Sequence, residues 1–73
     1  MTQNNISVGI DVGSTKVVTC IGKFDNGLVD IIGIGKSNNQ GVRKGVIVDI
    51  EETVSAISAS LEEAERMSGV ALQ

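Results

Sequence analysis

The sequence predicts an α/β fold in which a three-stranded antiparallel meander is followed by one helix. Two observations support this fold class. Before residue 38, apolar and β-branched residues form three short runs separated by turn-forming residues, which is typical of consecutive strands. From residue 50 onward, apolar residues instead recur at the three- and four-residue spacing of an amphipathic helix.

The first two strands are predicted at residues 6–11 and 16–24. The first alternates apolar residues with small ones, as a strand with one apolar face does. The second is rich in β-branched residues and is apolar on both faces as far as Lys23. We therefore expect this strand to be covered on both sides, with Cys20 as a small buried core residue in its middle.

An Asn26-Gly27 pair separates the second strand from a third, which is predicted at residues 28–34 or 28–37. Asn-Gly between two apolar runs favours a type I′ hairpin turn, because both central residues of that turn need positive φ. Gly33 and Gly35 permit a bend or close packing in the third strand. These features predict the meander.

Residues 38–48 are predicted to form a loop with turns at Gly41 and Gly45. A short extended segment over residues 46–48 is the alternative. Arg43 and Lys44 lie between the two glycines. They could contact a phosphate group or a partner, but a solvated basic pair is the preferred interpretation.

The helix is predicted to begin after Asp49 and to end at Gly69. Asp49 is a suitable N-cap with Glu52 three residues further on, and Gly69 can adopt the left-handed conformation that ends a helix. The apolar residues at helical spacing are predicted to form the face that packs on the sheet. They are Ile50, Val54, Ile57, Leu61 and Ala64.

Length and composition restrict the classes of function. The chain has 73 residues, of which 41% are hydrophobic and 1% aromatic, so it can form at most one small domain with a marginal core. Six basic and nine acidic residues give a net charge of -3. A nucleic-acid partner is not expected, because a basic surface is needed for that role.

Cysteine and histidine usage excludes several kinds of site. The chain has one cysteine and no histidine, so we expect a reducing compartment, no zinc site and no base that could activate Cys20. The beginning of the chain has neither the charge nor the apolar run of a signal peptide. The acidic residues Glu62, Glu63 and Glu65 are predicted to form a solvated helix face rather than a metal site, since helical geometry spreads them around the axis.

The strongest candidate for a functional site is the connection between the first two strands, Asp11-Val12-Gly13-Ser14-Thr15-Lys16. We expect a positive φ at Gly13 to point consecutive amides toward one anion, with added donors from the Ser14 and Thr15 hydroxyls and a positive charge from Lys16. Asp11 would repel phosphate but suits a hydrated Mg²⁺. The motif therefore indicates a nucleotide triphosphate tail bound with Mg²⁺. Turn geometry alone is the alternative.

The order of these elements resembles the start of the actin-like ATPase superfamily, and within it the chain is similar to the FtsA family of bacterial cell-division proteins. The resemblance covers nearly all residues after the first five. The phosphate motif is shared with sugar kinases and chaperone ATPases, whereas the glycine-spaced loop and the helix end are more particular to FtsA. The matching segments are GIDVGSTKV at 9–17, IIGIG at 31–35, GVRKGVIVD at 41–49 and EEAERMSG at 62–69.

The resemblance implies the amino-terminal part of an actin-like, ribonuclease-H-like domain with ATP and Mg²⁺ in a cleft between two halves. It implies that Asp11 orders the waters of Mg²⁺ and that the backbone of Gly13, Ser14 and Thr15 cradles the phosphates, with Lys16 beside them. No catalytic residue is assigned. At most weak ATPase activity is expected of the full-length protein, and none of these 73 residues alone.

The family role is to polymerise, to bind the tubulin-like protein FtsZ and to tether it to the inner membrane through a carboxy-terminal amphipathic helix. The resemblance thus implies a cytoplasmic protein at the inner face of that membrane, at the division septum. The alternatives are other actin-fold ATPases, namely a sugar kinase or a relative from pilus assembly or microcompartments.

Three segments are expected along the chain. They are a disordered start at 1–5, the first part of an actin-like subdomain at 6–69, and the beginning of an inserted subdomain at 70–73. Because three strands and one helix leave a sheet face and a strand edge uncovered, we expect a fragment whose own stability is near zero.

Overall fold

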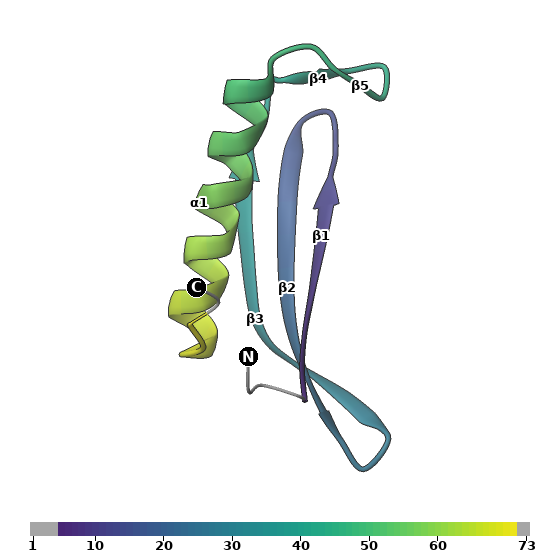
Figure 1. Ribbon diagram of the computed structural model, residues 1–73, viewed down its shortest axis with the longest axis vertical. Coiled ribbons are helices and arrows are strands. Elements are labelled where there is room, and N and C mark those ends of the chain that lie inside the picture. Colours follow the sequence, from purple (N-terminus) through teal and green to yellow (C-terminus); the bar gives the residue numbers. More distant parts are fainter. Residues whose placement is uncertain (1–4, 72–73) are drawn as a thin grey trace.

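The computed structural model describes residues 5–71 and has the predicted fold, a small sheet with one helix along it (Figure 1). Residues 1–4 and 72–73 lie outside the described residues, and so do those parts of the predicted segments 1–5 and 70–73. The elements in chain order are β1 (Ile6–Val12), β2 (Lys16–Asp25), β3 (Leu28–Asn38), β4 (Val42–Arg43), β5 (Val46–Ile47) and α1 (Ile50–Ser68).

The first three strands form an antiparallel sheet in the order β1-β2-β3, which confirms the predicted meander. The turn between β2 and β3 has φ values of 52° at Asn26 and 80° at Gly27, as a type I′ turn requires. β3 continues to Asn38, beyond both predicted ends. Immediately before β1, the carbonyl of Asn5 accepts a hydrogen bond of 2.8 Å from the amide of Phe24.

Residues 38–48 differ from the predicted loop, because they contain a second hairpin made of β4 and β5. Val42 pairs with Ile47 and Arg43 with Val46. Lys44 (φ 52°) and Gly45 (φ 78°) form the turn, with nearly the same positive φ values as Asn26 and Gly27. The turn at Gly45 was predicted, and β5 falls within the extended segment given as the alternative. The pairing with β4 was not predicted, since lysine seldom adopts the left-handed conformation.

Both ends of α1 form as predicted. The Oδ1 atom of Asp49 accepts a hydrogen bond of 3.0 Å from the amide of Glu52, which satisfies one free donor of the first turn. Gly69 has a φ of 75°, and its amide donates to the carbonyl of Glu65 at 2.9 Å. The helix is therefore fixed at both ends by local sequence.

The face of α1 that packs on the sheet is not the predicted one. Ile50 and Val54 are 71% and 54% exposed, while Ile57 and Leu61 are only half-buried. Of the predicted face, Ala64 alone is fully buried. The residues that contact the sheet most closely are small ones on the neighbouring stripe of the helix. They are Thr53, Ala56, Ser60 and Ala64.

Small residues occupy this interface because backbone meets backbone there. A Cβ atom at Gly35 would overlap the carbonyl of Ser60, and one at Gly33 would overlap the last turns of α1. The hydroxyl groups of Thr19 on β2 and Ser60 on α1 form a buried hydrogen bond of 2.7 Å. The prediction from hydrophobicity failed because a helix this close to a strand has room only for small residues, whether polar or apolar.

α1 covers one face of the sheet, so the expectation that β2 is covered on both sides is wrong for this chain (Figure 1). The residues of β2 that face α1 are fully buried, and they are Val17, Thr19 and Ile21. Val18 and Cys20 point to the other face and are only half-buried. Cys20 is therefore not the fully buried core residue that was predicted.

Two backbone amides on the outer edge of β3 form hydrogen bonds with side chains of α1. The amide of Lys36 donates to Oε1 of Glu63 at 2.7 Å, and the amide of Ile34 contacts Sδ of Met67 at 3.4 Å. One residue of the acidic cluster thus caps a strand edge, which reduces the exposure of unpaired amides. Among the residues that the structure describes, no group of three or more acidic or cysteine residues could hold a metal ion.

We expect Gly35→Ala to destabilise the intact protein by about 2–3 kcal/mol or to prevent folding, because the new methyl group meets the backbone of α1. The matched control is Gly9→Ala in β1, where an added Cβ meets no atom within 4 Å. Urea denaturation of both variants measures the difference. Equal stability of the two variants would contradict the close backbone packing.

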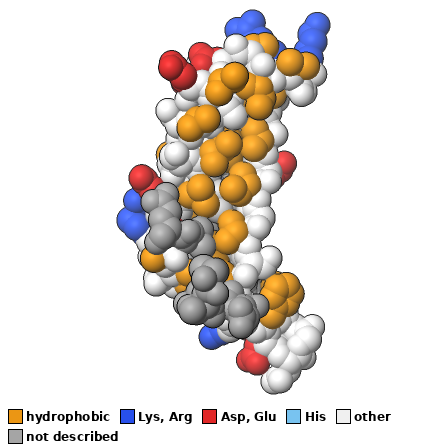
Figure 2. Space-filling view, viewed as in Figure 1, with side chains coloured by type: hydrophobic (Ala, Val, Ile, Leu, Met, Phe, Trp, Pro, Cys, Tyr) orange, Lys and Arg blue, Asp and Glu red, His pale blue; other side chains and the backbone are white. Residues whose placement is uncertain are grey.

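Apolar side chains form a band along the molecule over α1 and β1 (Figure 2). In β1, Val8, Ile10 and Val12 are 41%, 44% and 39% exposed. We expect the 73-residue chain on its own to self-associate and to unfold without a cooperative transition, since so much apolar surface is open and the core is small. Sedimentation velocity and thermal circular dichroism test this, and a monodisperse monomer with a sharp transition would contradict it.

Candidate functional site

Residues 13–15 connect β1 to β2 and form the predicted phosphate loop. The amide of Gly13 donates to the carbonyl of Lys16 at 2.9 Å and closes the hairpin. Gly13 is not among the described residues with positive φ, so the predicted role of its conformation is wrong. Its lack of a side chain matters for space instead, because a Cβ there would lie 3.1 Å from that same carbonyl.

The tip of this loop carries polar groups without partners. Within residues 5–71, neither the amides nor the hydroxyl groups of Ser14 and Thr15 form a hydrogen bond. Both residues are exposed. Two adjacent amides and two hydroxyl groups are thus available to an acceptor from outside this segment.

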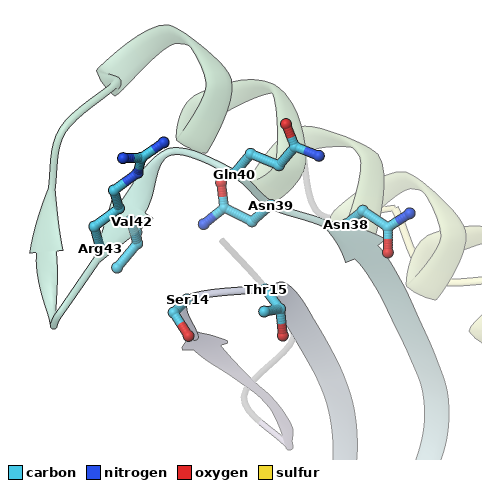
Figure 3. A pocket seen from close by; sticks show the side chains of 7 residues that line it. All are labelled: Ser14, Thr15, Asn38, Asn39, Gln40, Val42 and Arg43. Carbon is cyan, nitrogen blue, oxygen red and sulfur yellow. The ribbon is translucent and has the colours of Figure 1, made fainter.

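Ser14 and Thr15 also form one wall of a polar pocket of about 450 Å³ (Figure 3). The opposite wall is the segment between β3 and β4, which supplies Asn38, Asn39, Gln40, Val42 and Arg43. Arg43 lines the pocket but extends away from the two hydroxyl groups. The structure therefore brings the predicted loop close to the basic residue that was interpreted as solvated, without a contact between them.

Asp11 and Lys16 lie on the other side of the sheet from α1. Asp11 pairs with Val18, whose neighbours Val17 and Thr19 face α1, and side chains alternate along a strand. Lys16 precedes Val17, so the same alternation places it on the side of Asp11. Asp11 lines a second pocket, of about 410 Å³, with Gly9, Ile10, Val18 and Cys20.

Asn39 is the residue near this site that sequence reasoning missed. It is 1% exposed, and its backbone amide donates to the carbonyl of Thr15 at 2.8 Å. Its side-chain Nδ2 donates to the carbonyl of Gly13 at 3.2 Å. Nothing in the local sequence distinguishes Asn39 from its exposed neighbour Asn38. Only the packing of α1 shows which asparagine is buried.

Known proteins similar to this chain were found among bacterial cell-division proteins. It is 33% identical over 73 residues to "Cell division protein FtsA" of Enterococcus faecalis and 37% identical over 73 residues to that of Bacillus subtilis. It is 46% identical over 66 residues, or 89% of its length, to the FtsA of Borreliella burgdorferi. No protein-family model matches the chain.

These matches cover nearly the whole chain but a small part of each relative. The alignments take in 100% of the chain for the first two relatives and 16 or 17% of the length of the three relatives. Matches of this extent to FtsA proteins of diverse bacteria agree with the meander and helix of an actin-like domain. The chain therefore belongs to the FtsA family of bacterial cell-division proteins.

Proposed function

We propose that this chain supplies the first phosphate-binding loop of an actin-like, ATP-binding cell-division protein. The observation that carries the proposal is the set of unpartnered donors at Ser14 and Thr15. These exposed donors form no hydrogen bond within residues 5–71, so they are available to a ligand. Adjacent backbone amides together with hydroxyl groups suit phosphate oxygens. A cofactor with a phosphate chain fits this donor set.

Five residues of the motif have a part in the proposed site. The amides and hydroxyl groups of Ser14 and Thr15 hold the phosphates, and Lys16 contributes a positive charge. Asp11 orients the waters of Mg²⁺, which when bound neutralises phosphate charge. Gly13 leaves room for the hairpin to close. No residue is proposed as a general base, so at most weak ATP hydrolysis is expected of the full-length protein.

The proposed ATP site has one wall in this chain. Nucleotide sites usually enclose most of the ligand, whereas Ser14 and Thr15 are exposed at a loop tip. The matched segment is about a sixth of the length of its relatives, so the remaining contacts would come from further sequence. We accordingly propose that the whole protein polymerises and tethers FtsZ at the cytoplasmic face of the inner membrane, at the septum.

Membrane attachment in this proposal depends on a carboxy-terminal amphipathic helix beyond these residues. Over residues 5–71, no helix is both long and apolar enough to cross a membrane. A sugar kinase and a pilus-assembly or microcompartment protein were the alternatives. No observation on the chain favours them over the relatives named above.

Removal of both loop hydroxyl groups tests the donor set. We expect the double variant Ser14→Ala, Thr15→Val of the intact protein to bind MgATP about tenfold more weakly, since two hydrogen bonds to a charged group are lost. Ser55→Ala with Ser58→Ala, on the exposed side of α1, is the matched control. Calorimetric titration measures the affinities. Equal binding by both double variants would refute a phosphate role for this loop.

A separate variant tests the metal. We expect Asp11→Ala to weaken Mg²⁺-dependent ATP binding about tenfold, because outer-shell ligands contribute to that extent to metal affinity. Asp30→Ala, an exposed residue that pairs with Lys23 in the sheet, removes the same charge elsewhere. Titration with ATP at several Mg²⁺ concentrations gives the readout. If Asp11→Ala binds like Asp30→Ala at every concentration, Asp11 only shapes the turn.

A further inference from the structure

We propose that Asn39 is a positioning residue that ties the phosphate loop to α1 and aims the amide of Ser14 at the ligand. This inference rests on the proposed function of the loop. Asn39 lies between the loop and the helix, and each polar atom of its side chain has a partner on one side or the other. In this proposal Asn39 acts on a ligand only through the loop.

On the loop side, Asn39 fixes two carbonyl groups. Its Nδ2 donates to the carbonyl of Gly13 at 3.2 Å, and its backbone amide donates to that of Thr15 at 2.8 Å. These two carbonyls flank Ser14. Besides the hairpin bond between Gly13 and Lys16, they are the hydrogen bonds that hold this loop within the described part of the chain.

Peptide geometry turns this contact into a direction for the free donor. The carbonyl of Gly13 and the amide of Ser14 belong to one planar trans peptide, in which C=O and N–H point in opposite directions. A carbonyl held toward Asn39 therefore aims the Ser14 amide away from Asn39 and from α1. That is the side on which strand alternation places Asp11 and Lys16.

On the helix side, Oδ1 of Asn39 accepts hydrogen bonds from the amide of Gly41 at 3.0 Å and from the hydroxyl of Thr53 at 3.4 Å. These donors fix the orientation of the side-chain amide, because a flipped group would face donors with its NH₂ and the Gly13 carbonyl with its oxygen. Asn39 is 1% exposed and Thr53 is 3% exposed. Thr53 lies in the first turn of α1, so the loop is linked to the start of the helix through the largely buried side chain of Asn39.

A pre-aimed amide costs no reorganisation when an anion binds, which is the advantage of a preorganised donor. Asparagine suits this position because it can donate to the loop and accept from the helix at once. Aspartate has the same shape but cannot donate to Gly13. The substitution therefore removes the side-chain bond to Gly13 and leaves the backbone bond to Thr15 and both acceptor contacts in place.

The test compares Asn39→Asp with Asn38→Asp in the intact protein. Asn38 lines the same pocket, is exposed, and forms no side-chain hydrogen bond in the described part of the chain, so it controls for the added charge. We expect Asn39→Asp to lower MgATP affinity about tenfold relative to Asn38→Asp. Thr53→Val removes a helix-side donor instead, and we expect it to lower the midpoint of urea denaturation while MgATP affinity stays within about twofold.

Hydrogen–deuterium exchange of the ligand-free protein separates the positioning role from ATP binding. We expect Asn39→Asp to raise exchange at the Gly13 amide about fivefold or more over Asn38→Asp, since the Gly13 carbonyl loses its side-chain donor and the hairpin keeps only the backbone bond at Thr15. Unchanged exchange at Gly13 would overturn the positioning role of Asn39, whatever the MgATP affinity of the variant. Faster exchange with unchanged MgATP affinity would keep the anchor but overturn its effect on a phosphate ligand, whereas the phosphate role of the loop itself is decided by the Ser14 and Thr15 double variant. If Asn39→Asp does not fold, Asn39→Ala, which adds no charge, takes its place against Asn38→Ala with the same expectations.

Discussion

The close approach of α1 to β3 is the contact on which the rest of this structure depends. Gly33 and Gly35 present bare backbone to the helix, and Ser60 and Ala64 present little more. Because these residues have small side chains or none, the helix and the strand can pack densely, backbone against backbone. This packing restricts the size of the residues at the contact, because a single methyl group at Gly35 would overlap the backbone of α1.

A second close backbone contact lies at the amino-terminal end of α1. A Cβ at Gly41 would overlap the carbonyl of Asp49, so the chain is pressed against the start of α1 there as well. That proximity lets the amides of Val48 and Asp49 bond to the carbonyl of Gly41. It also encloses Asn39 between Thr53 and the loop. The geometry of the proposed phosphate site is therefore set by helix packing as much as by the turn itself.

Several large apolar residues of α1 and β1 take no part in this close packing and are exposed. Close packing uses the small residues, so Ile50 and Val54 are left on the surface of α1. The chain accounts for about a sixth of the length of its FtsA relatives. An exposed apolar band of this size is typical of a surface that contacts other protein.

The sequence by itself determined every feature that a few neighbouring residues control. The Asn26-Gly27 turn, the Asp49 cap and the Gly69 terminus follow from local backbone chemistry, and all three form as predicted. Hydrophobic periodicity predicted three strands and a helix but chose the wrong helix face, because it weighs apolarity and not the space between backbones. The motif from Asp11 to Lys16 was likewise visible in the sequence. Only the tertiary structure decided that Asn39 rather than Asn38 is buried behind that motif, since burial depends on a helix that begins eleven residues later.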